Sequence, residues 1–240
     1  MPLTPCPRIV VFDLDDTLLD HRAAERAALA DVHRLHHALL GHHALGHVQA
    51  TYHRCNAPLW ADFGAGRIGS AELKRLRSER TLAALGCDAL PADAFSRDYL
   101  GRYAAHWRWM PGAQEAYRVV ADAFPVGVLT NGFSEQQRGK LAAFPEIAER
   151  AAFAVISEEV GVMKPDPRLF AHVLQRASNA LGSPLQPAEV VYVGDSYASD
   201  VVGGTGAGWR VVWLGGDPGR APDGAVCADT WAGVRAALGV

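Results

Sequence analysis

The sequence predicts an α/β protein with a doubly wound parallel sheet and a helical insert after its first strand. Short, continuously apolar runs recur along the chain, as in strands that are covered on both faces. Helical patterns separate the later runs, and strands that alternate with helices form parallel sheets. After the first run, roughly ninety residues show helical patterns without a convincing strand, which is too long for one crossover.

The strands are expected where β-branched residues gather. The first is Arg8-Ile9-Val10-Val11-Phe12. Four later runs predict strands at 126–130, 153–156, 190–193 and 210–214. Helices are expected between the later strands, at 113–123, 134–143, 167–182 and 198–207. Asp166 and Pro167 open the third of these helices with an N-cap acid followed by a proline at the first helical position.

The insert reads as a series of amphipathic helices at 22–40, 46–60, 70–85 and 92–106. Ser70 is expected to cap the third helix, and Gly86 to follow its end. Trp109-Met110-Pro111-Gly112 would mark the return to the sheet. The predicted domains are a catalytic core of residues 1–17 and 109–240 and a helical domain of residues 18–108.

Composition excludes several classes of protein. The 240 residues are 49% hydrophobic, which indicates a packed core. The net charge of −3 gives no indication of a basic surface that would bind nucleic acid or an anionic membrane. No apolar run approaches the roughly 18 residues of a membrane span. The four scattered cysteines lack a CxxC pair, which favours free thiols. Residues 1–7 lack the regions of a signal peptide, so we expect a soluble, cytoplasmic protein; its oligomeric state is not indicated.

Carboxylates follow the first strand, in Asp13-Leu14-Asp15-Asp16-Thr17. Asp13 and Asp15 lie two positions apart and therefore point toward the same end of the sheet. Carboxylates that close together repel unless a cation or a shared proton compensates them. An acidic turn is the alternative, because Asp is common in turns and N-caps.

Other polar groups follow the later strands. They are Thr130-Asn131-Gly132, Lys164 and Gly194-Asp195-Ser196. Ligands of open α/β sheets bind beyond the carboxyl ends of the strands. We therefore expect these groups to surround one crevice together with Asp13 and Asp15.

The residue types indicate phosphate chemistry. Asp13, Asp15 and Asp195, without histidine or cysteine, form an oxygen-only site that suits Mg²⁺. Lys164 supplies a positive charge, and Thr130 and Asn131 supply neutral donors. One Asp could attack phosphorus and form an aspartyl-phosphate, while the second protonates the leaving alkoxide and later deprotonates water. Asp200, one turn into the next helix, is expected to support the site rather than to bind the metal.

In chain order, these segments resemble the four motifs of the haloacid dehalogenase-like (HAD) hydrolase superfamily. The resemblance implies a Rossmann-like core and an inserted α-helical cap, as in the phosphatase branch. It implies that Asp13 is the nucleophile and a Mg²⁺ ligand, and that Asp15 is the general acid/base and lends its backbone carbonyl to the metal. It further implies phosphate binding by Thr130 and Asn131, neutralisation of the phosphate by Lys164, and a third metal ligand in Asp195.

A narrower resemblance concerns the substrate. Three segments look like those of house-cleaning pyrimidine 5′-nucleotidases. They are Thr130-Asn131-Gly132-Phe133, the segment 155–162 that leads into Lys164-Pro165, and Gly203-Gly204 with Ala207-Gly208-Trp209. The leading hypothesis is therefore a phosphatase of nucleoside 5′-monophosphates. A sugar-phosphate or other small-metabolite phosphatase is the second hypothesis. A catalytically silent binding or regulatory protein is the third, although intact motifs argue against it.

Other reactions of the superfamily are weighed by their residues. Dehalogenases lack an acid two residues after the nucleophile, so Asp15 argues against dehalogenation. Phosphonatases need a Schiff-base lysine in the cap. The only lysine of the insert is Lys74, on a predicted helix far from the first motif, which argues against a phosphonatase. The motifs leave a mutase open. Lys74 and Lys140 lie in polar helical stretches and are expected to be solvated.

Three further patterns have ordinary interpretations. The histidines of the insert favour a solvated face over a transition-metal site, because no HExxH pattern accompanies them; they are His33, His36, His37, His42, His43 and His47. The glycine run from Gly203 precedes a strand, which is the reverse of a dinucleotide motif, and indicates close helix packing. The aromatic residues Trp60, Phe63, Trp107 and Trp109 are expected to pack more often than to stack on a base.

Overall fold

The computed structural model describes residue 3 and residues 6–240, which divide into two compact units. The core unit comprises the residues up to Asp20 together with 109–240, and the helical unit comprises 21–108. Residues 1–2 and 4–5 of the expected core lie outside the described residues. The division falls three residues after the expected boundary at 17, because Leu18 and Leu19 are buried among core side chains.

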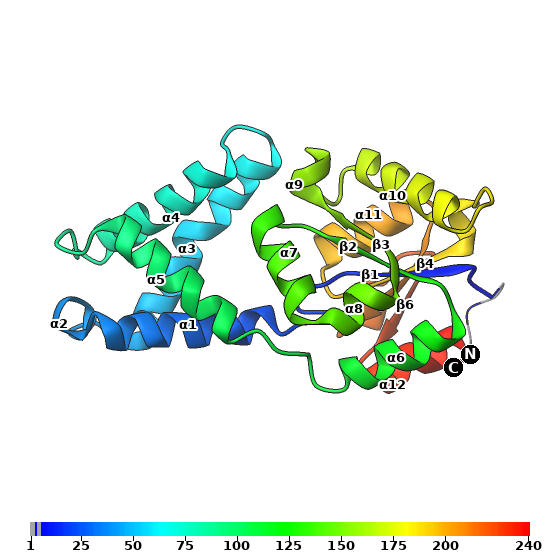
Figure 1. Cartoon of the computed structure of the whole chain (residues 1–240), viewed down its shortest axis with the longest axis horizontal. Coiled ribbons are helices and arrows are strands. Elements are labelled where there is room, and N and C mark those ends of the chain that lie inside the picture. The colour runs from blue at the N-terminus through cyan, green and yellow to red at the C-terminus, as the bar shows by residue number, and fades with distance from the viewer. Residues whose placement is uncertain (1–2, 4–5) are drawn as a thin grey trace. The chain divides into compact units, whose positions relative to one another are not determined.

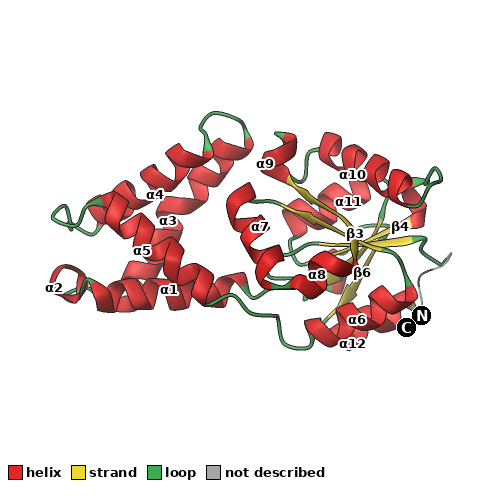
Figure 2. Ribbon diagram, viewed as in Figure 1, coloured by secondary structure: helices red, strands yellow, loops and turns green. Residues whose placement is uncertain are grey.

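The described part of the core unit forms a six-stranded parallel sheet in the order β3-β2-β1-β4-β5-β6 (Figures 1 and 2). The strands are β1 (Ile9–Phe12), β2 (Val126–Thr130), β3 (Ala151–Ile156), β4 (Val190–Gly194), β5 (Arg210–Leu214) and β6 (Ala225–Ala228). This order confirms the predicted α/β fold class. β6 was not predicted, because its four residues lie at the sheet edge and most are only half-buried, so that no strong apolar run marks it.

Helices cover both faces of the sheet. Alternate residues of β1 point to opposite faces: Val10 and Phe12 pack with α6 and α12, whereas Ile9 and Val11 pack with α10. The helices are α6 (Ala113–Ala123), α7 (Ser134–Ala143), α8 (Pro145–Arg150), α9 (Ser157–Val160), α10 (Pro167–Ala180), α11 (Val202–Gly206) and α12 (Trp231–Leu238). A π-helical turn, Tyr197–Val201, precedes α11, and two 3₁₀ turns lie at Pro187–Glu189 and Pro218–Arg220.

Local sequence signals explain several helix ends and packings. The Asp166 side chain accepts a hydrogen bond from the Arg168 amide at the start of α10, so the N-cap prediction is confirmed. A Cβ on Gly203 would come within 2.4 Å of the Phe170 ring, so close packing of α11 on α10 requires glycine there. The helices α8, α9 and α12 were not predicted because they are too short to show a clear period.

The helical unit consists of α1 (His21–Leu35), α2 (His37–Leu40), α3 (Leu45–Gly64), α4 (Ser70–Ala84) and α5 (Ala92–Ala105) in its described residues. At its centre the Arg77 guanidinium lies 5.3 Å from the Tyr52 ring centre and 5.1 Å from that of Tyr99. The expectation that Ser70 caps α4 is wrong: Gly69 is the N-cap and no side chain bonds there, because Ser70 is already helical. Among the described residues, no helix combines the length and apolarity that crossing a bilayer needs.

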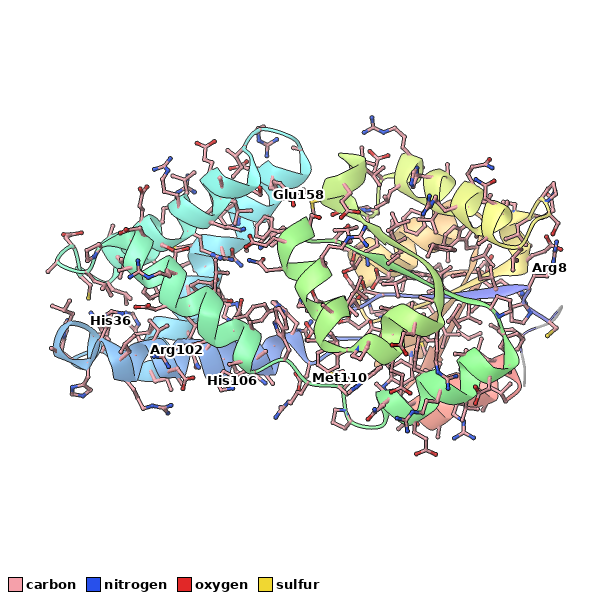
Figure 3. All side chains as sticks on the ribbon, in the orientation of Figure 1. Arg8, His36, Arg102, His106, Met110 and Glu158 are labelled. Atoms are coloured by element: carbon pink, nitrogen blue, oxygen red, sulfur yellow. The ribbon has the colours of Figure 1, made fainter. Side chains whose placement is uncertain are left out.

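Many histidines of the helical unit have specific partners, so the expected solvated face is wrong in part. His36 Nε2 lies 2.8 Å from Asp98 Oδ2 (His36, Arg102 and His106 are labelled in Figure 3). The rings of His33 and His43 each bond a backbone carbonyl oxygen.

The large aromatic residues pack against other rings. Trp109 contacts Tyr117 and Phe144 in the core unit, and Trp107 contacts Tyr103 in the helical unit.

Candidate active site

Asp13 leaves the centre of the sheet directly after β1. Its amide donates to the Val193 carbonyl at 2.9 Å, which continues the pairing of β1 with β4. Asp13 is only 5% exposed, and the Thr17 hydroxyl donates to its Oδ2 at 3.2 Å. Asp16 adopts the left-handed conformation with φ of +59°, which Asp tolerates better than most residues, and so turns the chain sharply behind Asp13.

Lys164 joins two carboxylates, that of Asp13 after β1 and that of Asp200 in the π-helical turn after β4. Its Nζ donates to Asp13 Oδ1 at 2.6 Å and to Asp200 Oδ1 at 2.7 Å, and lies 2.8 Å from the Tyr192 hydroxyl. Ordinarily burial lowers the pKa of a lysine, but the pKa of Lys164 is raised, because the attraction of Asp13 and Asp200 outweighs desolvation. Lys164 is therefore held as an ammonium ion.

Asp200 is fully buried beneath the loop that follows β4. Its Oδ2 accepts from the Ser196 amide at 3.0 Å, and its Oδ1 accepts from Lys164. A Cβ on Gly194 would stand 2.4 Å from Asp200 Oδ2, so only glycine lets this carboxylate approach the strand end. Both oxygens of Asp200 are thus engaged by protein groups.

The chemistry of this cluster fits a hard divalent cation. Asp13, Asp195 and Asp200 offer carboxylate oxygens that all lie within 4.8 Å of one another. Burial raises the pKa of Asp13, and the neighbouring Asp200 and Asp195 raise it further, against the lowering effect of Lys164. A divalent cation would offset the remaining negative charge, and an oxygen-only donor set suits Mg²⁺.

The loop after β2 lies against the backbone of Lys164. Asn131 Nδ2 donates to the Lys164 carbonyl at 3.1 Å, and the Lys164 amide donates to Asn131 Oδ1 at 2.8 Å. The Gly132 amide donates to Ser157 Oγ at 3.1 Å. The nitrogen and the oxygen of the Asn131 side-chain amide therefore hold the loop after β2 against the loop that carries Lys164. The expected hydrogen bond from Asn131 to phosphate would have to use the same Nδ2 that donates to Lys164.

Asp15 is held by two side chains of α7. Lys140 Nζ donates to both of its carboxylate oxygens, at 2.6 and 2.8 Å, and Gln137 Nε2 donates to Oδ2 at 3.0 Å. Gln137 also donates to Thr130 Oγ1 at 2.6 Å. The expectation of a solvated Lys140 is wrong, since the residue is 2% exposed.

The N-terminus of α7 is fixed in turn by α9, because the Ser134 amide donates to Glu158 Oε2 at 2.5 Å (Glu158 is labelled in Figure 3).

The structure thus places every expected site residue at the carboxyl end of the sheet. Asp13, Lys164, Asp195 and Asp200 form one cluster, and Gln137 connects Asp15 with Thr130 and Asn131. Sequence reasoning missed Thr17, Gln137, Lys140, Ser157 and Tyr192.

Some of these residues carried a signal. Gln137 and Lys140 are three positions apart, which places both on one helix face. Tyr192 stands in a fully apolar strand, where a buried hydroxyl needs a partner.

Comparisons with known proteins identify similar nucleotidases and phosphatases. The chain is 31% identical over 180 residues to pyrimidine 5′-nucleotidase YjjG of Escherichia coli, covering 75% of each chain. It is 32% identical over 243 residues to a phosphoserine phosphatase of Thermus thermophilus, covering 90% of this chain and 91% of that one.

Among solved structures, the magnesium-bound putative HAD-hydrolase YfnB of Bacillus subtilis has a TM-score of 0.77 at 23% identity, covering 98% of this chain and all of that one. Dehalogenases also occur among the similar folds. The family model described as haloacid dehalogenase-like hydrolase matches residues 7–208. The chain belongs to the haloacid dehalogenase-like hydrolases.

Proposed function

We propose that the protein is a Mg²⁺-dependent phosphomonoester hydrolase that forms an aspartyl-phosphate on Asp13. The observation that carries the proposal is that two carboxylates, two positions apart in the sequence, have different environments. Asp13 is buried against Lys164 within a cluster of acids, whereas Asp15, two positions on, is 24% exposed and held by Lys140. The two environments suit two roles, a nucleophile and a proton carrier.

The reaction would proceed in two steps. Asp13 attacks phosphorus, the bond between phosphorus and the ester oxygen breaks, and Asp15 gives its proton to the departing alkoxide. Water then attacks phosphorus and transfers a proton to Asp15, which releases inorganic phosphate and restores the Asp13 carboxylate. Lys164, Thr130 and Asn131 would bind phosphate oxygens at the strand ends.

Asp13, Asp195 and the backbone carbonyl of Asp15 would hold Mg²⁺. When bound, the ion supplies positive charge that screens the phosphate from the carboxylates. Asp200 would keep Lys164 in place through their 2.7 Å contact.

Lys140 would act as a positioning residue for Asp15. We expect Lys140→Met to lower kcat by about 10–100-fold with little change in KM, because a carboxylate that loses its orientation transfers protons less often. Arg138→Met is the matched control: Arg138 lies on the same helix, but its guanidinium pairs with Glu159. Steady-state kinetics at saturating Mg²⁺ measure both variants. Equal kcat values for the two variants would contradict a role for Lys140.

The substrate is proposed to be a nucleoside 5′-monophosphate. The similarity to two pyrimidine 5′-nucleotidases supports this choice, one of Escherichia coli and one of Streptococcus pneumoniae. The similarity to a phosphoserine phosphatase supports the second candidate, another small phosphorylated metabolite. The helical unit would act as the cap that selects between them.

A panel of phosphate esters tests the proposal. With Mg²⁺ we expect phosphate release to be fastest from a pyrimidine 5′-monophosphate and to be lost on addition of EDTA. A preference for phosphoserine or a sugar phosphate would contradict the proposed substrate but agree with the proposed reaction. A flat response across the panel would contradict phosphatase activity and favour a silent binding protein.

Two other reactions of the family are tested in parallel. A dehalogenase would release halide from 2-haloacids. We expect no halide release, because a carbon–halogen bond breaks without a proton donor and dehalogenases therefore lack the acid that Asp15 supplies here. A mutase would return the phosphate to an isomeric substrate rather than to water. Product analysis by phosphorus NMR separates transfer from hydrolysis.

A further inference from the structure

Two loops of the helical unit bring imidazole and thiol groups together. His42 and His43 lie between α2 and α3, and Cys87 lies between α4 and α5, and these loops occupy the same end of the unit (Figure 1). One ligand atom from each of the three side chains falls within 4.8 Å of the others. The ring centres of His42 and His43 are 4.1 Å apart.

A backbone contact sets the protonation pattern of His43. Its Nε2 lies 2.7 Å from the Leu85 carbonyl oxygen, which can only accept a hydrogen bond. In the neutral ring, Nε2 therefore carries the hydrogen and Nδ1 keeps the lone pair. Histidines that bind metals commonly donate their second ring N–H to a carbonyl in this manner, which fixes the tautomer and the ring orientation.

The loop that carries His43 is held from its other side as well. His33 Nε2 lies 2.9 Å from the His43 carbonyl oxygen, so α1 anchors the loop. His43 thus has both its backbone and its ring in place before any ion arrives.

Cys87 brings sulfur into the same place. It is 4% exposed, and its Sγ makes long contacts with two backbone carbonyl oxygens, at 3.4 Å with that of Leu39 and at 3.5 Å with that of Leu85. Burial raises the pKa of this thiol, so the thiol keeps its proton in the absence of a metal ion, and binding of an ion would release that proton. The two long contacts leave sulfur available for a stronger partner.

We propose that His42, His43 and Cys87 form a binding site for Zn²⁺ or a similar borderline-soft divalent cation. Zn²⁺ bonds of about 2.0 Å to nitrogen and about 2.3 Å to sulfur place ligand atoms up to roughly 4 Å apart. His42 is exposed, so its ring is free to rotate as an ion binds.

The donor set separates this site from the oxygen-only cluster of the core unit. Nitrogen and thiolate ligands favour Zn²⁺, whereas carboxylates favour Mg²⁺. A bound ion would join the α2–α3 loop to the α4–α5 loop and so stabilise the helical unit.

Cobalt titration tests the site directly. The full-length protein is kept reduced and saturated with Mg²⁺, and Co²⁺ is added as a spectroscopic probe. We expect one equivalent to give the near-ultraviolet band of thiolate-to-cobalt charge transfer, and Zn²⁺ to remove that band and raise the unfolding temperature. Cys87→Ser should abolish the band. His42→Asn should weaken Co²⁺ binding by at least about tenfold, and because His42 is exposed the variant should fold normally.

Cys55→Ser is the matched control, since Cys55 lies on α3 of the same unit but outside the cluster. It should keep the band at full intensity. The proposal is overturned if wild-type protein shows no thiolate band, or if the band persists in Cys87→Ser. An imidazole-only spectrum in the wild-type protein that is unchanged in Cys87→Ser would also overturn it, because it would mean adventitious binding to surface histidines.

Discussion

Replacing Asp13 with asparagine is expected to abolish turnover, with a fall in kcat on the order of 10⁵–10⁶-fold, as is typical when a nucleophile is removed. An amide nitrogen or oxygen at this position lacks the negative charge that attacks phosphorus. The fold should survive, because the change removes one of three clustered carboxylates and leaves Lys164 paired with Asp200. Steady-state kinetics and a thermal unfolding curve measure the two effects separately.

Asp16→Asn is the matched control for this variant. Asp16 is three residues away, has no proposed role, and holds a left-handed conformation that Asn also adopts readily. We expect its kcat to match that of the wild type. Mg²⁺-dependent turnover retained in Asp13→Asn would contradict the proposed mechanism, whatever the control shows.

Replacing Lys164 with methionine is expected to damage both stability and activity. The ammonium group contacts Asp13 and Asp200, which are 5% and 0% exposed, so its removal leaves two buried carboxylates without a counter-charge. Breaking a buried ion pair in this way costs about 3–5 kcal/mol in the free energy of unfolding. Turnover should fall to background, since no other side chain of the cluster would neutralise the phosphate.

Urea unfolding at several pH values checks the cause of this loss. Burial already raises the pKa of Asp13, so protonation at lower pH should relieve part of the repulsion and narrow the gap to the wild type. Arg168→Met, a change of similar size at an exposed cation on α10, should leave the unfolding midpoint nearly unchanged. A Lys164→Met midpoint equal to that of this control would show that the buried pairing is not stabilising.

The positions of the strands and of the motif residues could be predicted because each depends on local sequence. β1, β2 and β4 are short apolar runs, and the polar residues that follow them must emerge at one edge of a parallel sheet. The chain order of the motifs then brings Asp13, Lys164 and Asp195 together in one cluster. Nothing beyond strand direction was needed for that conclusion.

The partners of these residues could not be predicted, because they depend on tertiary packing. Lys140 reads as a surface lysine in a polar helix, yet α7 packs so that its side chain reaches Asp15. The tie between Asn131 and the backbone of Lys164 joins two segments 33 residues apart in sequence, and no local pattern marks it. The contact of the His43 ring with the Leu85 carbonyl, just after α4, likewise joins segments that are distant in sequence.

The most direct test is to trap the covalent intermediate in Asp15→Asn with p-nitrophenyl phosphate. The p-nitrophenolate leaving group of this substrate departs without a proton, so Asp13 should still be phosphorylated in the variant. Hydrolysis of the aspartyl-phosphate should be slow, because the base that activates water is missing. After acid quenching, borohydride reduction converts an aspartyl-phosphate to homoserine, which peptide mass spectrometry locates. We predict homoserine at position 13 and unmodified aspartate at position 16; phosphate release without any modification of Asp13 would contradict the account.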